Sequence, residues 1–99
     1  MKTKLKQISV LVQLALHVPR MEVEGFECTQ AKIIACYVAK KTKEFTDEDI
    51  SDFFREHPSV VELMLKQMAI NYLCYEDHRF IIDTVFEAYM QIEKYNVKQ

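Results

Sequence analysis

The chain of 99 residues is poor in the residues that interrupt regular structure, with one glycine, two prolines and no tryptophan. Because it also has many Leu, Ile, Met, Lys and Glu residues, an all-helical fold is favoured over one built from short strands and turns. Apolar residues make up 49% of the chain, which excludes a disordered polymer and suits one folded domain over residues 1–99.

Long apolar runs and paired cysteines are also missing. No uninterrupted apolar stretch reaches the ~18 residues of a membrane-spanning helix, so we expect no membrane contact. Residues 8–18 are apolar-rich and follow three lysines, but no small-residue cleavage site comes after them, which indicates a first helix rather than a signal peptide. The three cysteines, Cys28, Cys36 and Cys74, lack C-x-x-C spacing, which is typical of free thiols in a reducing cytoplasm.

The net charge of −2 hides an uneven distribution. Residues 1–43 hold eight Lys/Arg and three Glu, a net of +5, whereas residues 44–99 hold five Lys/Arg and twelve Asp/Glu, a net of −7. A nucleic-acid-binding domain usually carries a basic field. Only the first half of this chain can supply one.

Hydrophobic periodicity predicts five helices, over roughly residues 4–17, 29–43, 47–54, 58–75 and 78–95. Pro19 is predicted to end the first helix, and a connector over residues 21–27 contains Gly25. The second helix has the clearest buried face, formed by small and branched residues at i, i+3, i+4, i+7 and i+8: Ala31, Ile34, Ala35, Val38 and Ala39. The later aromatic residues follow helical spacing and are predicted to lie in the core: Tyr72, Tyr75, Phe80, Phe86 and Tyr89.

Capping residues support the boundaries of the later helices. Thr46 with Asp49 is a predicted capping pair for the third helix. Pro58 suits the first position of the fourth helix, with His57 as its N-cap, and Ser59 with Glu62 offers a rival capping box two residues on. Asp77 is the predicted cap of the fifth helix.

Three consecutive segments form a pattern that points to one family. A long helix carries Ala39-Lys40 near its end, Ile50 follows eleven residues after that alanine, and the fourth helix opens with the run Arg55-Glu56-His57-Pro58-Ser59-Val60. This pattern resembles the C-terminal DNA-binding domain of the bacterial replication initiator DnaA, a helix-turn-helix of the Trp-repressor type, most strongly over residues 33–68. The resemblance implies double-stranded DNA as the partner and a role in regulating replication or transcription. It also implies that the start of the fourth helix enters the major groove.

Carried over position by position, the resemblance implies base contacts from Glu56 and His57. Arg55 is a candidate for a phosphate or a guanine edge, and Glu56 for a cytosine amino group. The chain departs from the family at Pro58, where the family usually bears a hydroxyl. It departs again at residues 23–30, where the family has a basic loop and this chain has two glutamates and no arginine.

Each candidate residue also has a purely structural explanation. Arg55 can be a solvated side chain beside a carboxylate, and His57 and Ser59 can cap the fourth helix. Four lysines are candidate phosphate contacts: Lys32, Lys40, Lys41 and Lys43. The last three also complement the dipole at the end of the second helix, which requires no partner.

No catalytic or metal-binding arrangement is recognisable, because no two of the three histidines have the spacing of metal ligands and no cysteine has an identifiable base. We therefore expect neither an enzyme nor a bound cofactor. Two hypotheses remain. One is a small DNA-binding protein that reads the major groove with the fourth helix. The other is a degenerate helix-turn-helix scaffold that binds a partner protein or forms a homodimer, which an exposed apolar patch or a self-complementary face would favour.

Overall fold

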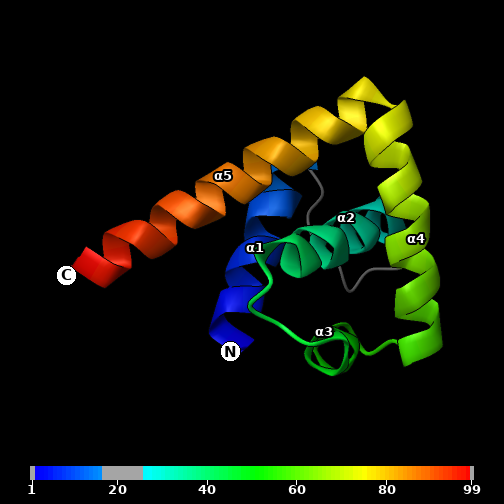
Figure 1. Ribbon diagram of the computed structural model, residues 1–99, viewed down its shortest axis with the longest axis horizontal. Helices are drawn as coiled ribbons and strands as arrows, with labels where there is room; N and C mark the ends of the chain where they lie inside the picture. Colours follow the sequence, from blue (N-terminus) through cyan, green and yellow to red (C-terminus); the bar gives the residue numbers. More distant parts are fainter. Residues whose placement is uncertain (1, 17–25, 99) are drawn as a thin grey trace.

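The computed structural model describes residues 2–16 and 26–98, and it is all-α over these ranges (Figure 1). Five helices with no strands account for almost all of the described residues: α1 (Lys2–Leu16), α2 (Phe26–Thr42), α3 (Asp47–Phe54), α4 (Pro58–Cys74) and α5 (Glu76–Lys98). The predicted fold class and the predicted number of helices are confirmed for this part of the chain.

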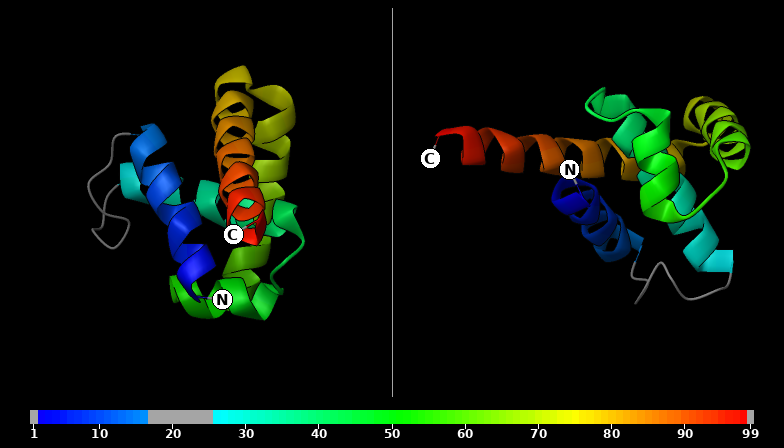
Figure 2. Two further views of the ribbon diagram at one scale, coloured as in Figure 1. Left: turned by 90° about the vertical axis from the view of Figure 1, so that its left-hand side faces the viewer. Right: turned by 90° about the horizontal axis from the view of Figure 1, so that it is seen from below.

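Helix α2 lies at the centre of the fold and packs against all four other helices (Figures 1 and 2). Its predicted face is confirmed, because Ala31, Ile34, Ala35, Val38 and Ala39 are all buried. Small side chains at three of these positions let neighbouring backbones approach closely. Helices α1 and α5 cover one side of α2. Helix α4 forms one edge of the molecule and packs directly against α2, and the short α3 connects the two along the chain.

The core is continuous across the five described helices. Its buried apolar members outside α2 come from every other element: Leu5, Ile8, Val12, Phe45, Ile50, Phe54, Val61, Met68, Ile82, Val85 and Tyr89. Within each helix these side chains follow helical spacing and form one inward stripe. Burial of each large apolar side chain contributes about 1.5–3 kcal/mol relative to exposure, so the stripes are sufficient to hold the helices together.

The observed boundaries differ from the predicted ones at several helix ends, and most clearly at the starts of α2 and α5. Helix α2 begins at Phe26 rather than near residue 29. Helix α5 begins at Glu76, directly after Tyr75 ends α4, so Asp77 lies in the first turn of α5 and is not its cap. The predicted end of the first helix at residue 17, Pro19 and residues 21–25 of the connector, Gly25 included, lie outside the described residues.

Two aromatic residues were wrongly predicted to lie in the core. Tyr75 and Phe80 are exposed, although Tyr89 is buried and both Tyr72 and Phe86 are partly buried. The sharp corner between α4 and α5 (Figure 1) is the reason, because Tyr75 joins the two helices there and Phe80 lies in the first turns of α5. Helical spacing therefore gave the right elements but not the direction in which the chain turns between them.

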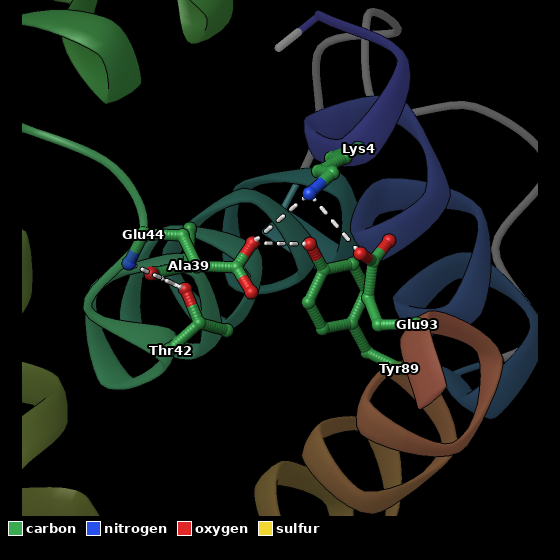
Figure 3. A network of polar contacts seen from close by, with 6 residues as sticks. All are labelled: Lys4, Ala39, Thr42, Glu44, Tyr89 and Glu93. Atoms are coloured by element: carbon green, nitrogen blue, oxygen red, sulfur yellow. Dashed lines mark hydrogen bonds and ion pairs between the residues drawn. The ribbon is translucent and has the colours of Figure 1, made fainter. Parts of the chain in front are cut away.

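A polar network joins α1, α5 and the turn after α2 (Figure 3). The Tyr89 hydroxyl donates to Glu44 Oε2 at 2.8 Å, and Lys4 Nζ lies 3.1 Å from Glu93 Oε2 and 3.8 Å from Glu44 Oε2. Burial and this hydrogen bond to Glu44 raise the pKa of Tyr89. Thr42 Oγ1 accepts from the Glu44 backbone N–H at 3.2 Å and thereby fixes the turn that presents the glutamate.

Within residues 2–16 and 26–98, none of the helices combines the length and the apolar character that crossing a membrane requires.

Candidate interaction surface at α3 and α4

The turn between α3 and α4 is held by backbone geometry and one serine. Thr46 and Asp49 form the predicted capping box at the start of α3. At its end, Arg55 adopts a left-handed conformation (φ 56°, ψ 44°), and its N–H donates to the Ser51 carbonyl. The Ser51 hydroxyl donates in turn to the Glu56 carbonyl at 2.6 Å. The left-handed residue directs the Arg55 side chain into solvent, where it makes no ion pair with any described residue.

His57 is the N-cap of α4, as predicted, and Pro58 occupies the first turn. The ring Nδ1 accepts from the Ser59 backbone N–H at 3.2 Å and lies 2.8 Å from the Ser59 hydroxyl. The rival capping box does not form, since Glu62 pairs instead with Lys66 at 3.3 Å. His57 and Ser59 are exposed and also occupied with local capping, which satisfies an orphan N–H of the helix terminus.

Glu56 does not point freely outward as a base contact would require. Its carboxylate pairs with Lys32 Nζ at 3.1 Å, and both side chains are partly buried. The pair lies beside Cys36, whose burial raises the pKa of the thiol to about 12. Glu56 and Lys32 thus neutralise each other, and the neighbouring thiol remains protonated at neutral pH.

The remaining lysine candidates lie at the other end of α2. Lys40 pairs with Asp47, and Lys43 is exposed with a left-handed backbone (φ 63°). Lys41 Nζ lies 3.2 Å from the Tyr72 hydroxyl and 3.5 Å from Asp83 Oδ1. Burial alone would lower the pKa of Lys41, but these two contacts outweigh burial and raise it. The structure therefore does not bring Lys41 together with Arg55 and His57, because its partner Tyr72 lies fifteen residues after His57, or roughly 22 Å along α4.

A cationic hollow lies beside the α3–α4 turn. It has a volume of about 480 Å³, and its walls come from three helices and the start of the turn. Lys6, Lys32 and Arg55 surround it, with Phe53 and Phe54 as its apolar wall. The sequence gives no signal for this hollow, because Lys6 approaches Arg55 only through the packing of α1 against α3.

The outward face of α4 carries large apolar side chains among polar ones, a feature that the sequence analysis does not predict. Four large side chains on this face, here called the α4 stripe, are exposed to solvent: Val60 (38%), Leu63 (67%), Ile70 (54%) and Leu73 (74%). The opposite face of the same helix supplies buried Val61 and Met68. A surface helix normally shows a polar outer face, so a helix that is apolar on both sides is typical of one covered on both sides.

Two further observations bear on the kind of site. Within the described part of the chain, no three His, Cys, Asp or Glu side chains come together as metal ligands would. Comparison of the chain with models of known protein families, with curated proteins and with solved structures finds no match.

Proposed function

We propose that the chain is a protein-interaction module, built on a helix-turn-helix-like pair of helices, that binds an apolar helix of a partner chain through the α4 stripe. The observation that carries this proposal is the exposure of Leu63, Ile70 and Leu73 on one face of a single helix. Clustered exposed side chains of this size mark interaction sites far more often than scattered ones do. Removing them from water would contribute to binding in proportion to the apolar area buried.

The charges around α4 support a protein partner over DNA. A helix that reads the major groove meets base edges with polar or cationic side chains. The only cationic residue within α4 is Lys66, and it pairs with Glu62. In a helix-turn-helix, the first helix crosses the phosphate backbone. Here that helix carries four carboxylates, which would repel phosphates: Asp47, Glu48, Asp49 and Asp52.

DNA binding is the second candidate function, and a specific observation favours it. Arg55, His57 and Ser59 are exposed where α4 begins, and the cationic hollow with Lys6 and Lys32 lies beside them. The N-terminus of a helix attracts phosphate through its free N–H groups and its dipole. A protein that binds DNA in this way would place the start of α4 in the major groove and leave the α4 stripe exposed to solvent.

Fluorescence anisotropy separates the two functions. The interaction proposal predicts no binding of a mixed-sequence duplex at about 50 mM salt, where phosphate contacts are strongest. Binding at this salt concentration would favour the second candidate. It would do so decisively if neutralising Lys6 and Arg55 flattened the plot of log K against log salt by about 0.9 per lost phosphate contact.

Site-specific photo-crosslinking tests the proposal itself in cells that make the protein. A photoreactive residue at position 63 should give one discrete protein adduct, whose peptides are then identified by mass spectrometry. The same residue at position 87, which is exposed on α5, is the control and should give none. A second substitution, Leu73→Glu, should abolish the adduct at position 63. An adduct pattern that is the same at both positions would contradict the proposal.

A further inference from the structure

We infer that the partner of α4 is a second copy of this chain, and that two α4 helices pack antiparallel across a two-fold axis between Lys66 and Gln67; this inference rests on the proposed function. The α4 stripe is palindromic about that point. Leu63 and Ile70 lie at equal distances from it along the helix, and so do Val60 and Leu73. Rotation about the axis therefore places Leu63 against Ile70 of the partner, and Val60 at the same level along the helix as Leu73 of the partner.

The positions around the helix decide which of these residues face each other. At 3.6 residues per turn, Leu63 and Ile70 project near the middle of the exposed face, while Val60 and Leu73 project toward opposite edges of it. A two-fold rotation that relates two facing antiparallel helices exchanges the ends of the face but keeps each edge on its own side. Leu63 and Ile70 therefore face each other across the middle of the seam, while Val60 of one copy and Leu73 of the other border it on opposite edges. An isologous interface presents the same patch from both copies, and the symmetric spacing of the α4 stripe about one point suits this arrangement.

The polar residues fit the same register. At the axis, the two copies of Lys66 lie on one edge and the two copies of Gln67 on the other, and each Lys66 is neutralised by Glu62 of its own helix at 3.3 Å. At each end, the exposed Arg55 and the N-terminus of α4 lie toward the start of α5 in the other copy, which carries exposed Glu76 and Asp77. Opposite charges therefore meet at both ends. The helix dipoles are also antiparallel, which brings each positive N-terminus to an acidic end.

The surface area that the outward face of α4 could bury suits a dimer that dissociates at micromolar to millimolar protein concentrations. From their exposed fractions, the four residues of the α4 stripe expose on the order of 400 Å² of apolar surface. Polar neighbours on the same face, such as Glu62, Lys66 and Gln67, roughly double this area, to about the ~800 Å² per partner of a standard interface. In Figures 1 and 2, α4 lies at one edge, and no other described helix covers its outer side.

Sedimentation equilibrium tests the pairing with a matched control. The protein is examined from about 1 µM to about 1 mM, the range in which interfaces of this size dissociate. We expect a monomer–dimer equilibrium. Leu63→Glu should raise the dissociation constant at least ~100-fold, because each substitution occurs twice in an isologous interface. Leu14→Glu, on α1, is the control: its side chain is 66% exposed, almost the same as that of Leu63, and the dissociation constant should not change.

Crosslinking tests the antiparallel register. In a background with Cys28 and Cys74 changed to serine, Gln67→Cys lies next to the axis and should join two copies through a short bifunctional thiol reagent. In the unaltered chain, the two Cys74 residues would lie roughly 22 Å apart along the helices and should not be joined by it. Glu87→Cys in the serine background is the negative control.

The outcomes separate the two levels of the proposal. A monomer at every concentration, or a dimer that withstands Leu63→Glu, overturns self-pairing. A dimer that is sensitive to Leu63→Glu, but in which Gln67→Cys is not crosslinked, overturns the antiparallel register. If the protein is monomeric and photo-crosslinking at position 63 captures a different protein, the proposed function stands and this inference fails. If both experiments fail, the proposed function fails as well.

Discussion

The left-handed backbone of Arg55 gives a quantitative prediction about both stability and role. For a residue with a Cβ atom, the left-handed conformation costs about 1–2 kcal/mol, whereas glycine adopts it freely. Glycine is also more flexible in the unfolded chain, which offsets about 0.4–1 kcal/mol of the gain. Arg55→Gly should therefore be more stable than Arg55→Ala by about 0.5–1 kcal/mol. In a domain of this size, that difference corresponds to roughly 2–8 °C in Tm.

The comparison of these two variants isolates the backbone, because both lack the cation. Urea unfolding at one low protein concentration keeps any self-association equal between them. Arg55→Ala should lie within about 0.5 kcal/mol of the unaltered protein, since the side chain is exposed and makes no ion pair with a described residue. If Arg55→Gly is no more stable than Arg55→Ala, the turn between α3 and α4 does not have the described conformation. Glycine would suit this backbone conformation better, so we attribute the arginine at position 55 to the contribution of its charge to the interface. Both variants lack that charge and should therefore raise the dissociation constant of the dimer.

Two further perturbations test the fold that presents the surface. Thr46→Ala removes one half of the capping box with Asp49 and should lower the free energy of unfolding by about 1 kcal/mol in urea titrations; an unchanged midpoint would mean that the box contributes nothing. Tyr89→Phe should cost about 1 kcal/mol at neutral pH, because it removes the hydrogen bond to Glu44. The raised pKa of Tyr89 means that this group contributes its full share to stability below about pH 10, the unfolded value, and loses it as the pH rises toward the folded value. The free-energy gap between the unaltered protein and Tyr89→Phe should therefore narrow above pH ~10, and a constant gap would refute the assigned cause.

Local patterns were sufficient to predict most of the fold. The predicted stripe of α2, the capping box at Thr46 and the N-cap at His57 depend on residues within a few positions of one another, and all are present. The exposure of Phe80 depends on how α4 and α5 are arranged relative to each other, and local spacing does not contain that information.

The candidate site was only partly predictable for the same reason. The sequence identified the α3–α4 turn, but it could not show that Glu56 pairs with Lys32 from α2, or that Lys41 pairs with Asp83 from α5. Both ion pairs join segments that are far apart in sequence. The α4 stripe has a sequence signal, since apolar residues occur on every side of α4, whereas the resemblance to a DNA-reading helix concerns only its first turn.

The central claim is that the outward face of α4 is a contact surface for a second copy of the chain, and nuclear magnetic resonance on dilution tests it most directly. Backbone amide shifts recorded across the concentration range of the dimer report contacts residue by residue. The account predicts shift changes concentrated in residues 59–75 and absent from the same residues of Leu63→Glu. Shifts in α4 that do not depend on concentration, together with changes around the cationic hollow when duplex DNA is added, would contradict it.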